Sequence, residues 1–130
     1  MRPLIDHVSI AVRDLAASAH FYDAVLGALG LTRLVERPAT IGFGKRYPEF
    51  WLNLRPTMAE GAATSGAHVC LRARRTAEVD AFHAAALAQG GGSDGAPGIR
   101  PHDRVAYYAT FIRDPDGNRI EAVTFVGRAD

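Results

Sequence analysis

Two histidines and one glutamate are the residues of this sequence best suited to bind a metal ion. His7 and His68 occur in two similar segments, Asp6–Ile10 and Ala67–Leu71, with the histidines 61 positions apart. Glu121 lies in a mostly apolar segment, where a carboxylate is costly to bury unless a cation meets it. Two imidazoles and one carboxylate bind Zn, Ni, Mn or Fe(II) and leave coordination positions open. The sequence therefore predicts one divalent metal ion held by these three side chains.

The same offset of 61 relates further residues, which indicates an internal duplication. It pairs Phe21 with Phe82, Leu26 with Leu87, and Gly30 with Gly91. We interpret the chain as a single domain of two modules, about 1–56 and about 67–130, joined by a linker at about 57–66 that is rich in Gly, Ala, Ser and Thr. Two such modules packed face to face would bring the two imidazoles together near a pseudo-twofold axis.

Hydrophobic periodicity gives both modules the same expected order of elements, βαβββ. In module one the expected strands are Leu4–Arg13, Leu31–Arg37, Thr40–Gly44 and Glu49–Arg55, with a helix capped by Asp14 and ended by Gly30. In module two a strand Ala67–Arg74 precedes a helix capped by Thr76, a long mobile loop Ser93–Arg104, and a hairpin of Val105–Arg113 and Arg119–Val126 joined by the turn Asp114–Asn118.

The expected fold class is α+β, because two helices can cover only one face of the strands. The other face of this curved mixed sheet would form the metal-binding cleft. Period-two alternation directs His7, His68 and Glu121 toward that cleft, together with Ser9 and Cys70. It also directs three residues of the fourth strand there, and these are the predicted pocket residues Trp51, Asn53 and Arg55.

Further residues are candidates for the pocket. Arg55 and Arg72 could pair with an anionic substrate, although a solvent-facing position fits them equally well. His102, Tyr107 and Tyr108 follow the expected loop and could form a lid with proton donors; alternatively, one tyrosine packs in the core and the other hydrogen-bonds at the rim. Other residues with reactive side chains are expected to be structural: His20 and His83 at the surface of their helices, and Cys70 as a small buried hydrophobe.

Composition excludes several classes of function. The net charge is +1 with no block of one sign, which argues against nucleic acid and membrane surfaces as partners. The N-terminus does not resemble a signal peptide, and a single cysteine cannot form an intrachain disulfide, so we expect a cytoplasmic location. Unpaired sheet edges favour a homodimer.

These motifs resemble the vicinal oxygen chelate superfamily, the group of glyoxalases, bleomycin resistance proteins and extradiol dioxygenases. The resemblance covers the whole chain, and its most specific parts are Asp6-His7-Val8, Ala67-His68-Val69 and the run from Asp114 to Glu121. It implies two βαβββ modules around a cleft, with His7, His68 and Glu121 as ligands of a metal that chelates vicinal oxygens of a small substrate. It also implies that modules can be exchanged between chains of a dimer.

One position departs from the family pattern. Glyoxalase I enzymes of this group usually supply a second glutamate from the fourth strand, and the internal repeat places the neutral Asn53 opposite Glu121. Because an amide cannot transfer protons as a carboxylate does, glyoxalase I activity itself is in doubt, unless Glu60 reaches in from the linker. Three functions remain open: a metal-dependent glyoxalase-like lyase or isomerase, an Fe(II) ring-cleavage dioxygenase, and a non-catalytic ligand-binding protein of the bleomycin-resistance type.

Overall fold

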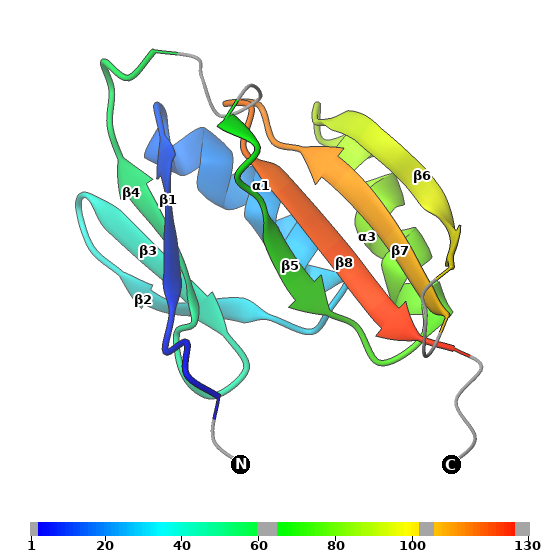
Figure 1. Ribbon diagram of the computed structural model, residues 1–130. Helices are drawn as coiled ribbons and strands as arrows, with labels where there is room; N and C mark the ends of the chain where they lie inside the picture. Colours follow the sequence, from blue (N-terminus) through cyan, green and yellow to red (C-terminus); the bar gives the residue numbers. More distant parts are fainter. Residues whose placement is uncertain (1–2, 60–64, 102–105, 127–130) are drawn as a thin grey trace.

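The computed structural model describes residues 3–59, 65–101 and 106–126. It confirms the duplicated βαβββ order (Figure 1). Within this part of the chain, no helix is long and apolar enough to cross a membrane. The elements are β1 (Val8–Val12), α1 (Leu15–Gly27), β2 (Thr32–Glu36), β3 (Thr40–Gly44), β4 (Phe50–Leu54), β5 (Val69–Arg72), α3 (Thr76–Ala88), β6 (Gly92–Arg100), β7 (Tyr107–Arg113) and β8 (Arg119–Phe125).

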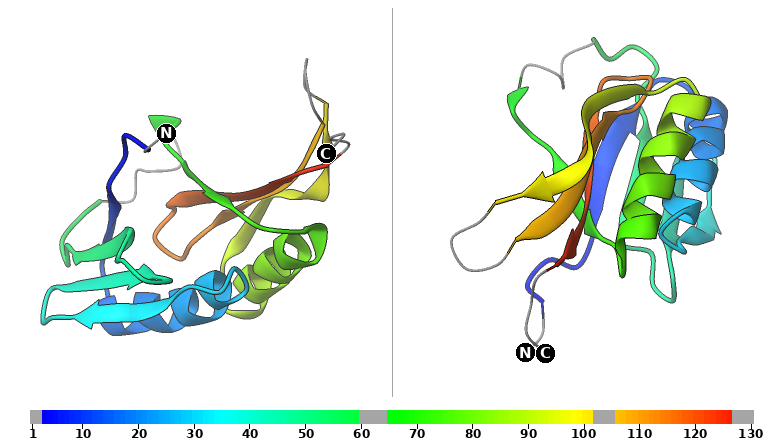
Figure 2. Two further views of the ribbon diagram at one scale, coloured as in Figure 1. Left: turned by 90° about the horizontal axis from the view of Figure 1, so that it is seen from below. Right: turned by 90° about the vertical axis from the view of Figure 1, so that its right-hand side faces the viewer.

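Each module forms its own four-stranded mixed sheet. The strand orders are β1-β4-β3-β2 and β5-β8-β7-β6, with β1 parallel to β4 and β5 parallel to β8. The two sheets lie next to each other with β1 and β5 at their inner edges (Figure 1). Both helices cover the same side of the strands, as Figure 2 shows. The expected arrangement, with helices on one face and an open face opposite, is therefore present.

The core lies between the helices and the sheets, and it follows the predicted alternation. On β4, Phe50 and Leu52 are buried against the helices, while Trp51 between them is only partly buried and lines a cavity on the other face. On β8, Ile120 and Ala122 are completely buried in the same way. Because burying a large apolar side chain stabilises a fold by about 1.5–3 kcal/mol, this alternation fixes which residues face the open side.

The two helices begin differently. The carboxylate of Asp14 accepts a hydrogen bond from the backbone N–H of Ala17 at 3.0 Å, which confirms the predicted cap of α1. Thr76 was predicted to cap α3, and that prediction is wrong: the cap position is Arg75, which makes no side-chain cap bond. Glu78 instead reaches back and accepts from the backbone N–H of Arg74 at 2.8 Å. A carboxylate therefore accepts a backbone hydrogen bond at the start of each helix: Asp14 from the cap position of α1, and Glu78 from within the first turn of α3.

The expected loop Ser93–Arg104 is corrected by the structure, because most of it forms β6. Within the described residues this strand pairs with β7 alone, and its register shifts between Ser93 and Gly95 and again between Gly95 and Gly98. An outermost strand tolerates proline and glycine, since one side of its backbone needs no ladder partner. The turn-forming residues that suggested a loop are therefore accommodated as irregularities of an edge strand.

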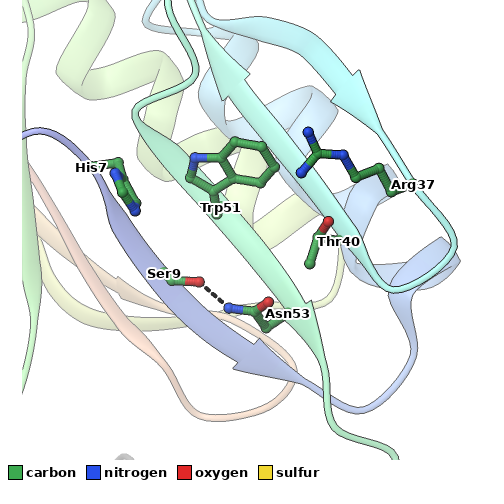
Figure 3. A pocket seen from close by; sticks show the side chains of 6 residues that line it. All are labelled: His7, Ser9, Arg37, Thr40, Trp51 and Asn53. Carbon is green, nitrogen blue, oxygen red and sulfur yellow. Dashed lines mark hydrogen bonds between the residues drawn. The ribbon is translucent and has the colours of Figure 1, made fainter.

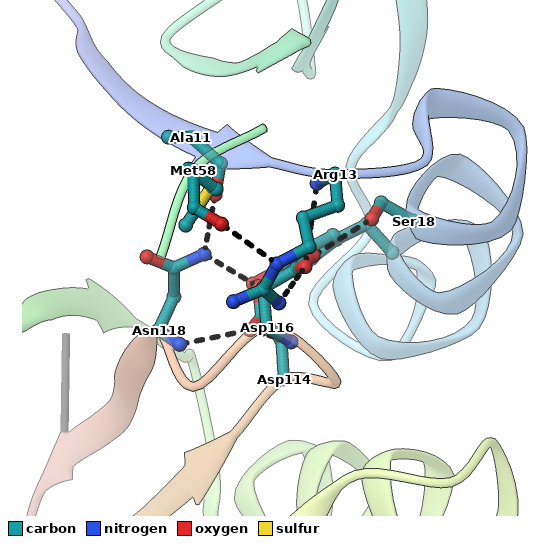
Figure 4. Close-up of polar contacts among 8 residues, drawn as sticks. Ala11, Arg13, Ser18, Met58, Asp114, Asp116 and Asn118 are labelled. Atoms are coloured by element: carbon teal, nitrogen blue, oxygen red, sulfur yellow. Dashed lines mark hydrogen bonds and ion pairs between the residues drawn. The ribbon is translucent and has the colours of Figure 1, made fainter. Parts of the chain in front are cut away.

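The turn between β7 and β8 ties module two to module one (Figure 4). Asp116 forms an ion pair with Arg13 at 2.9 Å, and Asn118 donates its side-chain N–H to the carbonyl of Ala11 at 2.9 Å. Ser18, buried on α1, donates to Asp116 as well. The turn predicted from sequence only as a hairpin connection therefore also binds the first strand and helix of the other module.

Asp114 is the buried centre of this turn. Its carboxylate accepts from the hydroxyl of Tyr22 at 2.7 Å and from the backbone N–H groups of Asp116 and Asn118 at 2.9 and 2.8 Å. Burial raises the pKa of Asp114, and the hydrogen bonds from Asn118 and Tyr22 act in the opposite direction. Burial also raises the pKa of Tyr22 well above its ordinary value, so its hydroxyl stays protonated as a donor.

Candidate metal and substrate site

His7 lies just before β1 and is held by its neighbour. Its Nδ1 is 2.7 Å from a carboxylate oxygen of Asp6, which also accepts from the hydroxyl of Tyr47 at 2.8 Å. Both hydrogen bonds lower the pKa of Asp6, so this carboxylate is ionised and can only accept. In the neutral tautomer whose Nδ1–H donates to Asp6, Nε2 of His7 presents the lone pair, as in histidines that bind a metal.

In module two, a histidine and a glutamate converge from neighbouring strands. Nε2 of His68 lies 3.0 Å from Oε1 of Glu121, whose residue is buried, with 7% of its surface exposed. The His68 ring also contacts Phe111, with ring centroids 5.6 Å apart. The sequence predicted a metal ion as the partner of this buried carboxylate; in the structure the carboxylate contacts the imidazole of His68, the other predicted ligand in module two.

The spacing of this pair permits metal binding. Two ligand atoms each about 2.1 Å from a metal ion and at right angles to each other are about 3.0 Å apart. This is the separation of His68 Nε2 and Glu121 Oε1. Both donor types, imidazole nitrogen and carboxylate oxygen, suit the divalent ions predicted from sequence. The residues of module two therefore fit two adjacent coordination positions.

His7, the third predicted ligand, lines a cavity together with His68 but does not form one group with His68 and Glu121. His7 and His68 both line a cavity of about 470 Å³ between β1 and β5. Among the described residues, however, no group of three His, Cys, Asp or Glu side chains is close enough to hold a metal ion. The structure thus brings the two histidines to one cavity and leaves a complete set of three ligands unassembled in the described chain.

Cys70 lies on the same open face as His68. The prediction that it is a small buried residue is wrong, because its side chain is exposed at the surface. Partial desolvation, followed by the charge of Glu121, raises the pKa of Cys70 to about 12. The neutral thiol is therefore the form present near neutral pH, and it is not a ready nucleophile.

A second cavity lies on the open face of module one (Figure 3). It has a volume of about 300 Å³ and contains two of the predicted pocket residues, Trp51 and Asn53. The side-chain amide of Asn53 donates to the hydroxyl of Ser9. The full lining is His7, Ser9, Arg37, Thr40, Trp51 and Asn53, so His7 borders both cavities.

Arg37 was missed by the sequence analysis, and the reason is a register shift. Strict alternation along β2 would place Arg33, Val35 and Arg37 on one face. The pairing of β2 with β3 shifts between Arg33 and Val35, so Arg33 binds Asp23 on α1 while Arg37 lines the open cavity. A bulge reverses the direction of later side chains and leaves little local signal in the sequence.

The ladder register also corrects the alignment of the two modules. Ser9 pairs with Trp51, and Cys70, which is 61 positions after Ser9, pairs with Glu121. By hydrogen-bond register, Trp51 and not Asn53 therefore occupies the position of Glu121. Asn53 still faces the same cavity, two residues farther along β4.

The remaining predicted pocket residues lie in different surroundings. Arg72 lines the cavity between β1 and β5 and stacks over Phe125 at 4.9 Å, and Tyr107 contacts the same ring. Arg55 donates to the carbonyl of Leu54 and is not among the residues lining the two cavities. The hydroxyl of Tyr108 donates to Asp80 on α3 at 2.6 Å, which places that side chain on the helix side. His102 and Glu60 lie outside the described residues.

Comparisons with known proteins identify the family. The family model of the Glyoxalase/Bleomycin resistance protein/Dioxygenase superfamily matches residues 4–122. A crystal structure of a glyoxalase/bleomycin resistance protein from Albidiferax ferrireducens T118 is 32% identical with a TM-score of 0.83, covering 93% of this chain and 98% of that one. No curated protein matches the chain.

More distant structures share the fold alone. A genomically encoded fosfomycin resistance protein from Listeria monocytogenes is 15% identical with a TM-score of 0.67, covering 95% of this chain and 93% of that one. A glyoxalase I mutant from Zea mays is 22% identical with a TM-score of 0.71, covering 90% of this chain and 44% of that one. From the family match over most of its length, the chain belongs to the Glyoxalase/Bleomycin resistance protein/Dioxygenase superfamily.

Proposed function

We propose that this protein is a divalent-metal-dependent, glyoxalase-like lyase or isomerase that acts on a small oxygenated substrate. The observation that carries the proposal is the contact between His68 and Glu121, 3.0 Å apart on the open face of module two. A buried carboxylate is retained there beside an imidazole, at a spacing that suits two neighbouring metal ligands. His7 supplies the third ligand in this proposal.

The bound metal would act as a Lewis acid that polarises an oxygen of the substrate. The residues of the chain position that chemistry. Glu121 lies on β8, and its Oε1 is 3.0 Å from Nε2 of His68. Asp6 orients His7 through Nδ1, and Trp51 forms an apolar wall beside it. Neither Trp51, the register counterpart of Glu121, nor Asn53 can act as a base near neutral pH, which favours a reaction other than that of glyoxalase I.

A second copy of the chain would complete the site. We propose a homodimer in which His7 of one protomer binds the same metal as His68 and Glu121 of its partner. Two observations support this arrangement: the three side chains do not form one group within the described chain, and β1 and β5 each end a sheet. A second protomer on the open face can supply the missing ligand.

Metal content tests the proposal directly. Protein purified without chelators should contain about one divalent ion per chain, and the variants His7→Ala and Glu121→Ala should each lose it. His20→Ala is the matched control, because this histidine is exposed on α1 and borders neither cavity. A parent protein that stays metal-free after incubation with Zn, Ni, Mn and Fe(II) would overturn the enzyme proposal.

Mixing the two variants tests whether the site is shared. If ligands come from both protomers, a mixed dimer of His7→Ala and Glu121→Ala chains contains one intact site, formed by the unmutated His7 and Glu121. Metal binding should then reappear on mixing. If all ligands come from one chain, each protomer of the mixed dimer lacks one, and no binding returns.

Two alternatives make different predictions in the same measurement. The absence of a three-ligand group among the described residues is the observation that favours a ligand-sequestering protein, which would bind no metal. An Fe(II) dioxygenase would instead purify with iron in preference to zinc, nickel or manganese. The identity of the bound ion therefore separates all three functions.

A further inference from the structure

The cavity on the open face of module one contains a cation that pairs with no carboxylate of the described residues. Arg37 has its guanidinium carbon 5.5 Å from the ring centre of Trp51, within the range of a cation–π contact. The nearest acidic residue in sequence, Glu36, instead pairs with Arg33 at 3.1 Å. Within the described chain, no Asp or Glu lines this cavity. The cavity therefore carries a positive charge.

The aromatic wall beside this cation is held in place. The indole N–H of Trp51 donates to the carbonyl of Pro48 at 3.1 Å. Gly42 is the cross-strand partner of Trp51, and a Cβ at that position would lie 3.0 Å from the indole ring and from Pro48. The glycine thus permits the ring to lie close against β3. Trp51 is therefore a preorganised surface for the guanidinium.

The backbone of Arg37 is also held in place by a hydrogen bond. Its backbone N–H donates to the carbonyl of Thr40 at 2.9 Å, which closes the turn between β2 and β3. A guanidinium that stacks on a ring uses its face, and its N–H donors remain in the plane around its edge. Such an edge can bind both oxygens of a carboxylate at once. Thr40, which lines the same cavity, adds a hydroxyl donor.

We propose that Arg37 and Trp51 form a subsite for the carboxylate of a small organic acid, with Trp51 contacting the apolar part of that molecule. His7, a proposed metal ligand, borders the same cavity. The further step, that the bound acid is the substrate of the enzyme, therefore rests on the proposed function. The substrate would then be an oxygenated carboxylate, with its anionic end on Arg37 and its reacting oxygens toward His7. Arg37 would select anionic over neutral substrates.

Intrinsic fluorescence tests the subsite without metal. Trp51 is the only tryptophan of the 130 residues, so its emission reports binding in this cavity. Benzoate and its neutral analogue benzamide are titrated into protein treated with a chelator. Benzoate should bind at least about tenfold more tightly than benzamide, because charge-assisted hydrogen bonds between a guanidinium and a carboxylate are stronger than those to a neutral amide.

Variants identify the residue responsible. Arg37→Leu should lose the preference for benzoate, and Arg37→Lys should keep part of it, since a lysine retains the charge without the planar edge. Arg46→Leu is the matched control: it removes the same charge from an exposed position of module one that does not line the cavity. Thermal unfolding of each variant, followed by circular dichroism, confirms that it is folded.

The results separate this inference from the proposed function. Equal binding of benzoate and benzamide, a preference that survives Arg37→Leu, or no change in emission with either probe would each overturn the subsite. If the preference depends on Arg37 while the protein binds no metal, the subsite stands and the enzyme proposal fails. If metal binds at the three predicted ligands but the preference is absent, only the subsite fails.

Discussion

The two modules of this chain have the same order of helices and strands but present different side chains on equivalent strands. In module two, the residue before β5 and the strand β8 present an imidazole and a carboxylate, His68 and Glu121, 3.0 Å apart. In module one, the register-equivalent position of Glu121 is Trp51, and the strand pair β1–β4 presents neutral side chains with a cation at the side. Under the proposals above, the duplicated scaffold divides its functions: module two holds two of the three metal ligands, and module one holds the third ligand and the carboxylate subsite.

The largest effect is expected from breaking the contact that holds the modules together. Asp114→Ala should lower the free energy of unfolding by about 3–5 kcal/mol, because four donor groups would lose this acceptor, and each one left buried and unsatisfied costs about 1–3 kcal/mol. Urea denaturation at pH 7 measures this loss. Pro115→Ala, at an exposed position of the same turn, is the control. A loss below 1 kcal/mol would show that the modules do not depend on this contact.

The next effect compares the two modules at their open faces. Glu121→Gln should weaken metal binding by more than about 100-fold, since losing a residue that only supports a ligand already costs 10–100-fold. Asn53→Ala should change metal affinity by less than about threefold, because its amide binds Ser9 and is not a proposed ligand. Isothermal titration with the ion found in the purified protein measures both. Equal losses in the two variants would show that module one also supplies a ligand from β4.

A smaller effect on the free energy of unfolding is expected from substitutions at the caps of the two helices. Asp14→Ala should lower the free energy of unfolding by about 1 kcal/mol, because the backbone N–H of Ala17 loses its cap. Arg75→Ser should raise it by up to about 1 kcal/mol, since serine can cap α3 and arginine does not. Chemical denaturation of the two variants beside the parent is sufficient. Shifts in the same direction would contradict the assigned difference between the caps.

The smallest effect is a pH dependence at the start of α3. The backbone hydrogen bond from Arg74 is the main cause that lowers the pKa of Glu78 in the folded protein. A carboxyl with a lowered folded-state pKa contributes stability above its unfolded pKa and loses it as the pH falls through the folded value. Glu78→Gln should therefore melt below the parent at pH 7, and the gap should close below about pH 4. A gap that is independent of pH would assign the effect to packing.

The periodicity of the sequence predicted those features that depend only on neighbouring residues within one strand. Alternation on β4 identified the buried and open faces, whereas the five central residues of β8 are all buried; the contact of His68 with Glu121 agrees with the predicted direction of both side chains. The same rule failed at Arg37, because the bulge in β2 changes the face, and at β6, where edge-strand glycines suggested a loop. Each failure occurs where a strand departs from ideal pairing.

Contacts between residues far apart in the sequence could not be predicted from such local patterns. The bond between Tyr22 and Asp114 joins residues 92 positions apart, and the sequence identified only the hairpin turn around Asp114. Likewise, ladder register decided that Trp51 and not Asn53 is the counterpart of Glu121. Register depends on how whole strands pair, so a comparison of two segments of sequence could be displaced by two residues without any local sign of error.

The irregular outer strands have a consequence for how the protein behaves at high concentration. Both outermost strands, β2 and β6, carry register shifts, and β6 also contains Pro97. A shifted, proline-containing edge cannot template a further strand, which is how globular proteins avoid growing into fibrils. Two copies can therefore associate through the inner edges or the open faces, while continuous sheet-to-sheet aggregation from the outside is suppressed.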